Sequence, residues 1–171
     1  MAIHHSLAAP VASAHHGVAM GKRYRSNVAA ILQRSDGRIF IARRSDYPES
    51  WQFPQGGVDD GEKPREALGR EVAEEVALPP GAYRIAEERG GYRYDFPEGP
   101  DRRGFHGQEQ TYFLCLLEEG TEAQADPLKG CGEFSEARWV AADDFPHHLV
   151  PPMKRAVYRR VLRDFFGAGR E

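Results

Sequence analysis

Cysteine is scarce in this chain of 171 residues: only Cys115 and Cys131 are present, and no CxxC motif occurs. Two cysteines cannot form the disulfide framework on which small secreted domains depend. Cys115 lies within an apolar run, so we expect it in the core. This usage of cysteine favours a reducing compartment, the cytoplasm.

Long apolar runs are also lacking. No stretch approaches the roughly 18 residues that span a bilayer, so we expect no contact with a membrane. Ala-Ser-Ala at 12–14 resembles a signal cleavage site, but no basic segment precedes it and Pro10 interrupts the short apolar stretch. We therefore expect residues 1–22 to be a disordered leader and residues 23–171 to form a single domain.

An excess of charge of one sign is absent as well, with 23 Lys and Arg against 26 Asp and Glu. Such a balance argues against indiscriminate binding to nucleic acid, and we expect no DNA partner. The charge is nevertheless uneven: residues 59–75 carry seven acidic and three basic side chains, whereas residues 152–166 carry five basic and one acidic. An acidic metal site and a basic helix would together hold a polyphosphate. Two solvated helix faces are the alternative.

Hydrophobic patterning predicts short strands and two helices. The strands are expected over 27–33, 38–42, 51–53, 83–94, 108–117 and 137–140, and the helices over 64–77 and 153–166. Pro64 suits the first turn of the earlier helix. Short strands interrupted by two helices indicate an α/β fold, a sandwich built around a mixed sheet.

The helix over 64–77 brings three carboxylates together. Glu71, Glu74 and Glu75 stand three and four residues apart, so they lie on one side of the helix. Glu71 and Glu75 fall beside the apolar stripe that begins at Leu68, which directs them toward the protein body. Carboxylates there repel each other and are costly to bury unless a cation compensates them. Magnesium prefers such oxygen ligands, so the spacing predicts a metal site.

Gly56, Glu62 and the run Arg-Glu-Val-Ala-Glu-Glu-Val-Ala-Leu at 70–78 resemble the Nudix box, a loop–helix–loop motif. The resemblance implies a Nudix-type α/β/α sandwich and a hydrolase of phosphoanhydride bonds that uses Mg²⁺ or Mn²⁺. Such chemistry needs neutralised charge on the phosphate oxygens, a polarised water and an in-line geometry. Metal ions clamped between carboxylates supply all three, and a glutamate not fully committed to metal can accept the proton of the water. Which glutamate is the base, and how many metal ions bind, stay open.

The resemblance also assigns roles to residues of the box. The motif residues are Gly56, Glu62, Arg70, Glu71, Glu74 and Glu75. The three helical glutamates would ligate metal, Arg70 would brace one of them through a salt bridge, and Gly56 and Gly57 would let the loop approach the substrate. Ala77 stands where the family usually has glycine, so we expect an altered exit from the helix.

Segments beyond the box are similar to one Nudix subfamily, the bacterial RNA pyrophosphohydrolases, also described as dinucleoside polyphosphate hydrolases. They include 24–28, 50–57, 92–97, 107–110 and 154–161, and the similarity covers essentially residues 23–166. It implies that the substrate is a nucleotide or an RNA 5′ end, which would be converted to a 5′-monophosphate. Hydrolysis of small nucleotides, such as nucleotide sugars or damaged nucleoside triphosphates, is one alternative. A non-catalytic nucleotide-binding module is another, and the oligomeric state is not indicated.

The same similarity extends the predicted site. It makes Glu133 a fourth acidic metal ligand. Substrate contacts are assigned to Arg25, Arg43, Arg44, Tyr94, Gln108, Gln110, Met153 and Lys154. Arg44 as a surface residue, Tyr94 as a core residue and the two glutamines as an edge-strand polar face are the alternatives. Met153 stands where the subfamily tends to place a phenylalanine that can stack on a base; methionine can cover a base but lacks an aromatic face.

Overall fold

The computed structural model describes residues 21–169, so nearly all of the expected leader, residues 1–20, lies outside the described residues. Within the described part, seven strands form one hydrogen-bonded sheet, accompanied by two α-helices and four 3₁₀ helices. At its beginning, Lys22 forms an ion pair with Asp95 of the sheet. Neither α-helix of this part has the length and apolarity needed to cross a bilayer.

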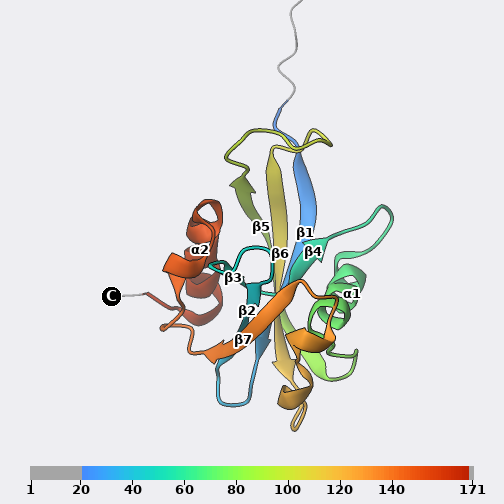
Figure 1. Ribbon diagram of the computed structural model, residues 1–171, viewed down its shortest axis with the longest axis vertical. Helices are drawn as coiled ribbons and strands as arrows, with labels where there is room; N and C mark the ends of the chain where they lie inside the picture. The colour runs from blue at the N-terminus through green and yellow to red at the C-terminus, as the bar shows by residue number, and fades with distance from the viewer. Residues whose placement is uncertain (1–20, 170–171) are drawn as a thin grey trace, which may run out of the picture.

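The longest strands lie side by side in the sheet (Figure 1). Strand β1 (Tyr24–Gln33) pairs in parallel with β6 (Gly107–Leu117), and β5 (Tyr83–Asp95) pairs antiparallel to β6 on its other side. Their order is therefore β1, β6, β5, and β5 forms an edge of the sheet. The short strand β4 (Gln55–Gly57) pairs antiparallel to β1. Parallel and antiparallel pairs therefore coexist, which confirms the predicted mixed sheet.

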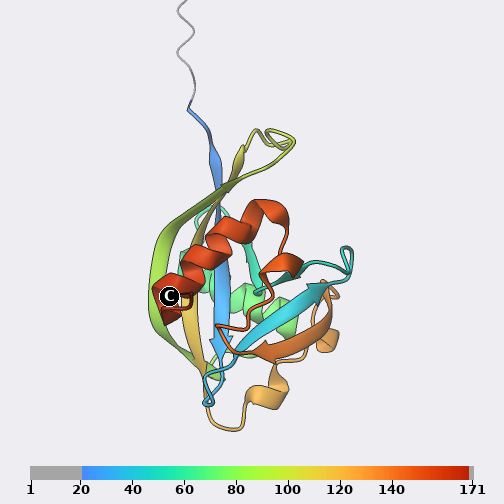
Figure 2. The same cartoon turned by 90° about the vertical axis from the view of Figure 1, so that its left-hand side faces the viewer.

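A second group of strands is linked to β1 by a single residue pair. Strand β2 (Ile39–Arg44) pairs antiparallel with β3 (Trp51–Gln52) and with β7 (Phe134–Val140). Its link to β1 is one residue pair, Gln33 with Ile39. In Figure 2, β2 and β7 cross the direction of β1.

The two helices cover opposite faces of β1 (Figures 1 and 2). Val28, Ala30 and Leu32 pack with the apolar side of α1 (Pro64–Val76), whereas Ala29 and Ile31 pack with α2 (Arg155–Phe166). The strand is buried on both faces, which explains its nearly continuous apolar sequence. This layering confirms the predicted α/β/α sandwich.

Several boundaries differ from the sequence predictions. The sequence does not predict β4, because Pro54 and two glycines suit a strand poorly. The segment forms a strand because β1 offers it partners: Ala30 N donates to Pro54 O at 2.8 Å, and residues 27–29 pair with 55–57. Before α2, Pro152–Lys154 form a 3₁₀ turn, so the α-helix begins at Arg155 rather than at 153.

The end of α1 is closed by the loop that follows β6. Asp126 N donates to Val76 O at 2.9 Å and Cys131 N to Glu74 O at 2.6 Å, which satisfies carbonyls that the helix leaves free. Ala77 has φ of 55°, in the left-handed region. The expected change of the helix exit is therefore not seen. Ala77 itself adopts the conformation that glycine favours, at the cost of local strain.

We expect Ala77→Gly to raise the free energy of unfolding by roughly 0.5–1 kcal/mol, because glycine removes the steric strain of a positive φ but loses more chain entropy on folding. Urea denaturation measures the change. Ala73→Gly is the matched control, since Ala73 is exposed within the same helix, where glycine should cost about 1 kcal/mol. Equal destabilisation by both substitutions would contradict the interpretation of Ala77.

Candidate active site

Helix α1 directs two of its glutamates inward. Glu75 is 1% exposed, and the side chain of Glu71 is 14% exposed, whereas that of Glu74 is 55% exposed. Leu68 and Val76 are buried on the adjoining stripe. The helix therefore has the orientation that its sequence predicts, with Glu71 and Glu75 toward the protein body.

Glu75 is a buried carboxylate with one unsatisfied oxygen. Its Oε2 accepts a hydrogen bond from the main-chain N–H of Gln55 at 2.8 Å, while Oε1 has no partner within residues 21–169. Burial, and next the negative charge of Glu133, raise the pKa of Glu75 to about 10. Glu133 therefore lies close to the helical glutamates, although 58 positions separate it from Glu75 in the sequence.

Glu133 is held in place by the end of β2. Ser45 N donates to Glu133 O at 2.8 Å, and the Ser45 hydroxyl donates to Gly132 O at 2.8 Å. Arg44 Nη1 donates to Glu133 Oε1 at 2.8 Å. The same guanidinium forms two further bonds to Asp46, at 2.7 and 2.6 Å. Arg44 is thus a part-buried clamp between two carboxylates rather than a free surface residue.

Arg70 braces the other side of the site. It donates to both oxygens of Glu62 at 2.9 and 2.8 Å, to Glu71 Oε1 at 2.6 Å and to Gly57 O at 2.9 Å. The guanidinium lowers the pKa of Glu62 to about 2. Burial is the main cause that raises the pKa of Glu71, and Arg70 opposes it. Arg70 therefore joins the glycine loop to the helix.

Both predicted loop glycines are needed for close packing. A Cβ on Gly56 would lie 1.9 Å from the carboxyl carbon of Glu71, and one on Gly57 would lie 2.0 Å from a guanidinium nitrogen of Arg25. Neither distance is sterically possible. A side chain at either position would therefore displace the end of the Glu71 or the Arg25 side chain from the place it has here.

A large cavity lies beside Arg44. It has a volume of about 1010 Å³ and is bounded by the segments 44–52 and 148–155. Met153 and Tyr47, which are 38% and 66% exposed, are two of the three large apolar side chains exposed within residues 21–169, and both line it. The cavity is thus partly apolar and carries cations, a combination suited to a nucleotide.

Lys154 is buried in the wall of this cavity. Its Nζ donates to Gln52 Oε1 at 3.3 Å and lies 5.4 Å from the centre of the Tyr94 ring. Burial, followed by the charge of Arg44, lowers the pKa of Lys154 to about 8. The Tyr94 hydroxyl donates to Gln108 Oε1 at 2.6 Å. Three of the predicted substrate contacts therefore lie together.

Two predicted substrate contacts are occupied elsewhere in the structure. Arg43 pairs with Glu136 of β7 at 3.3 Å. Gln110 is 0% exposed, and its amide is bonded to Asn27, Gln55 and Tyr112, each at 2.8 Å. Because Gln110 is fully buried and its amide is already bonded, it has no exposed surface with which to contact a nucleotide. We therefore assign it an internal role.

Sequence reasoning missed the residues that hold the predicted ones. They are Ser45, Asp46, Tyr47, Gln52 and Gln55. All belong to the segment 44–57. This segment contributes the residues that hold Glu133, part of the rim of the cavity, and the main-chain N–H that binds Glu75. Their types are ordinary for loops and short strands, and only the run Trp-Gln-Phe-Pro-Gln at 51–55 is distinctive.

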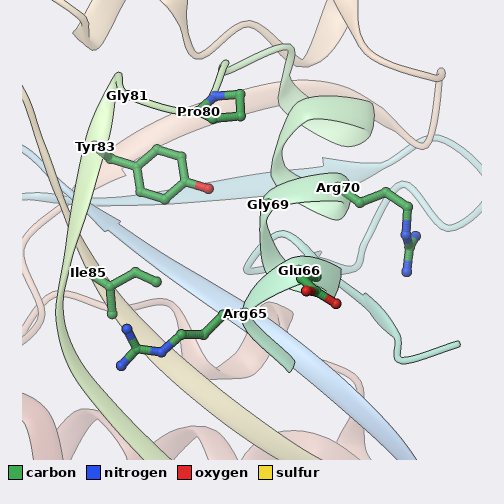
Figure 3. Close-up of a pocket in the computed structure, with 8 residues that line it drawn as sticks. All are labelled: Arg65, Glu66, Gly69, Arg70, Pro80, Gly81, Tyr83 and Ile85. Carbon is green, nitrogen blue, oxygen red and sulfur yellow. The ribbon is translucent and has the colours of Figure 1, made fainter. Parts of the chain in front are cut away.

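A second, smaller hollow of about 560 Å³ lies between α1 and the start of β5 (Figure 3). The Tyr83 ring points toward Gly69 of α1, while the guanidinium of Arg70 points away from the hollow. The hollow is therefore separate from the side of α1 that carries the inward glutamates.

The carboxylates fit a hard divalent cation by their chemistry. All donors are carboxylate oxygens, and Glu75 Oε1 is buried without a partner. Within residues 21–169, however, no three acidic, histidine or cysteine side chains converge closely enough to form a ready cage. The reason is visible in the ion pairs: Arg70 holds Glu71, and Arg44 holds Glu133. A cation would have to take these oxygens from the arginines.

Comparison with known proteins agrees with this geometry. A family model described as NUDIX domain matches residues 23–165. A protein named RNA pyrophosphohydrolase from Nitratiruptor sp. is 43% identical over 150 residues, which cover 84% of this chain and 94% of that protein. A protein of the same name from Rhodospirillum rubrum is 38% identical over 155 residues, covering 87% and 91%.

Solved structures share the fold. An Ap4A hydrolase of C. elegans in a binary complex superposes with a TM-score of 0.62 at 19% identity, covering 84% of this chain and 98% of that one. The dihydroneopterin triphosphate pyrophosphohydrolase of E. coli gives 0.60 at 20% identity, covering 84% and 97%. With the motif, the sandwich and a family match over most of its length, the chain belongs to the Nudix family.

Proposed function

We propose that this chain is a metal-dependent hydrolase of phosphoanhydride bonds that acts on RNA 5′ ends and also splits dinucleoside polyphosphates. The product from 5′-triphosphate or 5′-diphosphate RNA is a 5′-monophosphate. The observation that carries the proposal is the buried, half-satisfied carboxylate of Glu75 beside Glu71 and Glu133. The names and close similarity of the two bacterial relatives support the RNA 5′ end as substrate.

Glu71, Glu74, Glu75 and Glu133 would hold Mg²⁺ or Mn²⁺, which supplies charge neutralisation on phosphate oxygens and a polarised water. The protein keeps these carboxylates ready. Arg70 fixes Glu71 by a 2.6 Å bond, and the main chain of Gln55 fixes Glu75. A glutamate with a free oxygen accepts the proton of the attacking water.

Cationic side chains would bind the phosphates. Arg25 lies against Gly57, and Arg44 and Lys154 line the cavity. Guanidinium groups match phosphate oxygens in pairs, so Arg44 exchanges the carboxylates of Asp46 and Glu133 for phosphate oxygens when substrate binds.

The base end of the substrate would lie against the apolar rim of the cavity, where Met153 is 38% exposed. The cytoplasm fits this reaction, and the exposed free thiol of Cys131 supports a reducing compartment. Hydrolysis of nucleotide sugars or damaged nucleoside triphosphates is the rival within the family. It shares the carboxylates and differs only in what the cavity accepts.

Replacing Glu75 by glutamine is expected to lower kcat/KM by about 10²-fold or more, because the site loses a charged oxygen ligand. The readout besides activity is thermal unfolding: Mg²⁺ should raise the Tm of the wild type and raise that of the variant much less. Glu66→Gln is the control, since Glu66 is exposed on the same helix and glutamine keeps its capping bond to Lys63 N. Near-full turnover of Glu75→Gln at saturating Mg²⁺ would refute the metal mechanism.

A substrate panel at fixed Mg²⁺ separates the functional alternatives. We expect phosphate or pyrophosphate release from 5′-triphosphate RNA, cleavage of diadenosine tetraphosphate, and slower hydrolysis of nucleotide sugars and nucleoside triphosphates. Glu75→Gln provides the blank for contaminating activity. Inert RNA beside hydrolysed small nucleotides would reject the RNA assignment, and inactivity with both Mg²⁺ and Mn²⁺ would favour a binding module.

We expect Met153→Phe to lower KM for 5′-triphosphate RNA by roughly 3–10-fold with little change in kcat, because an aromatic ring stacks on a base better than a thioether does. Steady-state kinetics on one short RNA measures the effect. Leu128→Phe is the control, because Leu128 is 75% exposed and lies outside the cavity. An unchanged KM would mean that no base contacts residue 153.

A further inference from the structure

Three glutamines and a lysine form one hydrogen-bonded chain in the core. Gln110 Nε2 donates to Gln55 Oε1 at 2.8 Å, and Gln55 Nε2 donates to Gln52 Oε1 at 3.0 Å. Lys154 Nζ donates to the same oxygen of Gln52. None of the four residues is more than 9% exposed. We call Gln110, Gln55 and Gln52 the glutamine relay. Burying polar groups costs free energy unless they are hydrogen-bonded, so a buried chain of four polar side chains suggests a specific role.

The lysine fixes the direction of every amide in the relay. An ammonium group has hydrogen-bond donors only, so Gln52 must face Lys154 with its oxygen. That oxygen also accepts from Gln55 Nε2, which leaves Gln55 Oε1 to accept from Gln110. At the far end, Gln110 Oε1 accepts from the Tyr112 hydroxyl. Reversing the Gln52 amide would place donors against donors at both of its neighbours.

The orientation of the Gln52 amide satisfies the hydrogen bonds of its neighbours but not all of its own. Its Nε2 is buried and has no partner within the described part of the chain. The relay also reaches both halves of the site. The main chain of Gln55 holds Glu75 Oε2, while Gln52 and Lys154 line the cavity. The metal side and the substrate side are therefore tied to one rigid polar unit.

We propose that Gln52 is a positioning residue for substrate binding: its Oε1 holds the ammonium group of Lys154 at the cavity wall, and the relay keeps that oxygen directed there. The proposed function on which this rests is the one in which Lys154 contacts the substrate. Without the acceptor, the ammonium group of Lys154 has no hydrogen bond to any described residue and keeps the face of the Tyr94 ring and the more distant charges of Glu133 and Glu75. Its flexible stem then occupies the binding conformation less often, and substrate affinity falls while the carboxylate chemistry stays.

The test begins with Gln52→Met, which removes the acceptor while roughly keeping the length and volume of the side chain. We expect KM for 5′-triphosphate RNA to rise about tenfold, as for loss of a hydrogen bond to a charged group, and kcat to change less than about threefold. The Mg²⁺ concentration for half-maximal rate should stay the same. An unchanged KM, or a loss confined to kcat, overturns the proposal.

A double-mutant cycle separates positioning from general disruption. Lys154→Met should raise KM at least as much as Gln52→Met, and the double variant should match Lys154→Met alone, because nothing remains to be positioned. Additive effects overturn the proposal. An unchanged KM in Lys154→Met removes both the assignment of Lys154 and its positioning by Gln52. Failure of the proposed function itself is distinct, because the wild type would then not hydrolyse RNA at all.

Two further variants control for stability. Tyr158→Phe removes a buried hydroxyl that accepts from Phe53 N at 3.1 Å, outside the relay. It should lower Tm without raising KM, and a tenfold rise in KM there would show that the KM effect is not specific. Gln110→Met releases the relay from its far end, so KM should rise in the same direction by a smaller factor. This variant decides the question if Gln52→Met does not fold, and an unchanged KM in folded Gln110→Met then overturns the proposal.

Discussion

Burial of the Glu75 carboxylate is the constraint around which the site is arranged. The residue is 1% exposed, and its neighbours Val72 and Val76 are core residues of α1, so the carboxylate cannot turn to water without moving the helix. A buried charge without full compensation is unfavourable by several kcal/mol. Glu133 increases this cost by adding a second negative charge, and the pKa of Glu75 rises to about 10, so the group holds a proton near neutral pH unless a cation replaces it. The fold thus stores an electrostatic demand at one point, and a divalent cation is the group that meets it best.

Two arginines make that demand tolerable. Arg70 holds Glu71 and Glu62 on one side, and Arg44 holds Glu133 and Asp46 on the other, so the outer carboxylates are compensated while Glu75 Oε1 is not. Each arginine also ties a loop to a regular element. Removing Arg70 would leave Glu62 and Glu71 unpaired and would also free the carbonyl of Gly57, because one side chain makes all of these bonds. Removing Arg44 would leave the side chain of Glu133 unpaired, while Ser45 still holds its main chain.

The inward orientation of Glu71 and Glu75 followed from the sequence because both lie on one helix. The period of α1 alone places Glu71 and Glu75 beside the buried stripe, and the residue spacing names the motif. The failures involve contacts between distant segments. Strand β4 exists because β1 pairs with it, and Gln110 became a buried network residue because Asn27, Gln55 and Tyr112 surround it. The conformational preferences of the local sequence predict neither the pairing of β4 nor the burial of Gln110. The prediction for Ala77 was wrong for a different reason: the residue adopts a left-handed conformation that alanine disfavours.

The carboxylates proposed to bind metal and the cavity proposed to bind the substrate belong to different parts of the chain. Most of the carboxylates project from α1, whereas the cavity is built from the segment 44–52, which ends with β3, and the segment 148–155, which leads into α2. A family motif on the helix therefore says which bond is broken but little about which nucleotide carries it. The two parts must still be held in a fixed relative position, because the reacting phosphate has to lie at the carboxylates while the rest of the substrate occupies the cavity. Gln55 links the two parts, since its main chain contacts Glu75 and its side chain leads through Gln52 to Lys154. Among the described residues, the side chains of Tyr47 and Met153 form no hydrogen bond to the carboxylates or to the relay. Substitutions that change substrate preference should therefore disturb the site least at these two positions of the cavity rim.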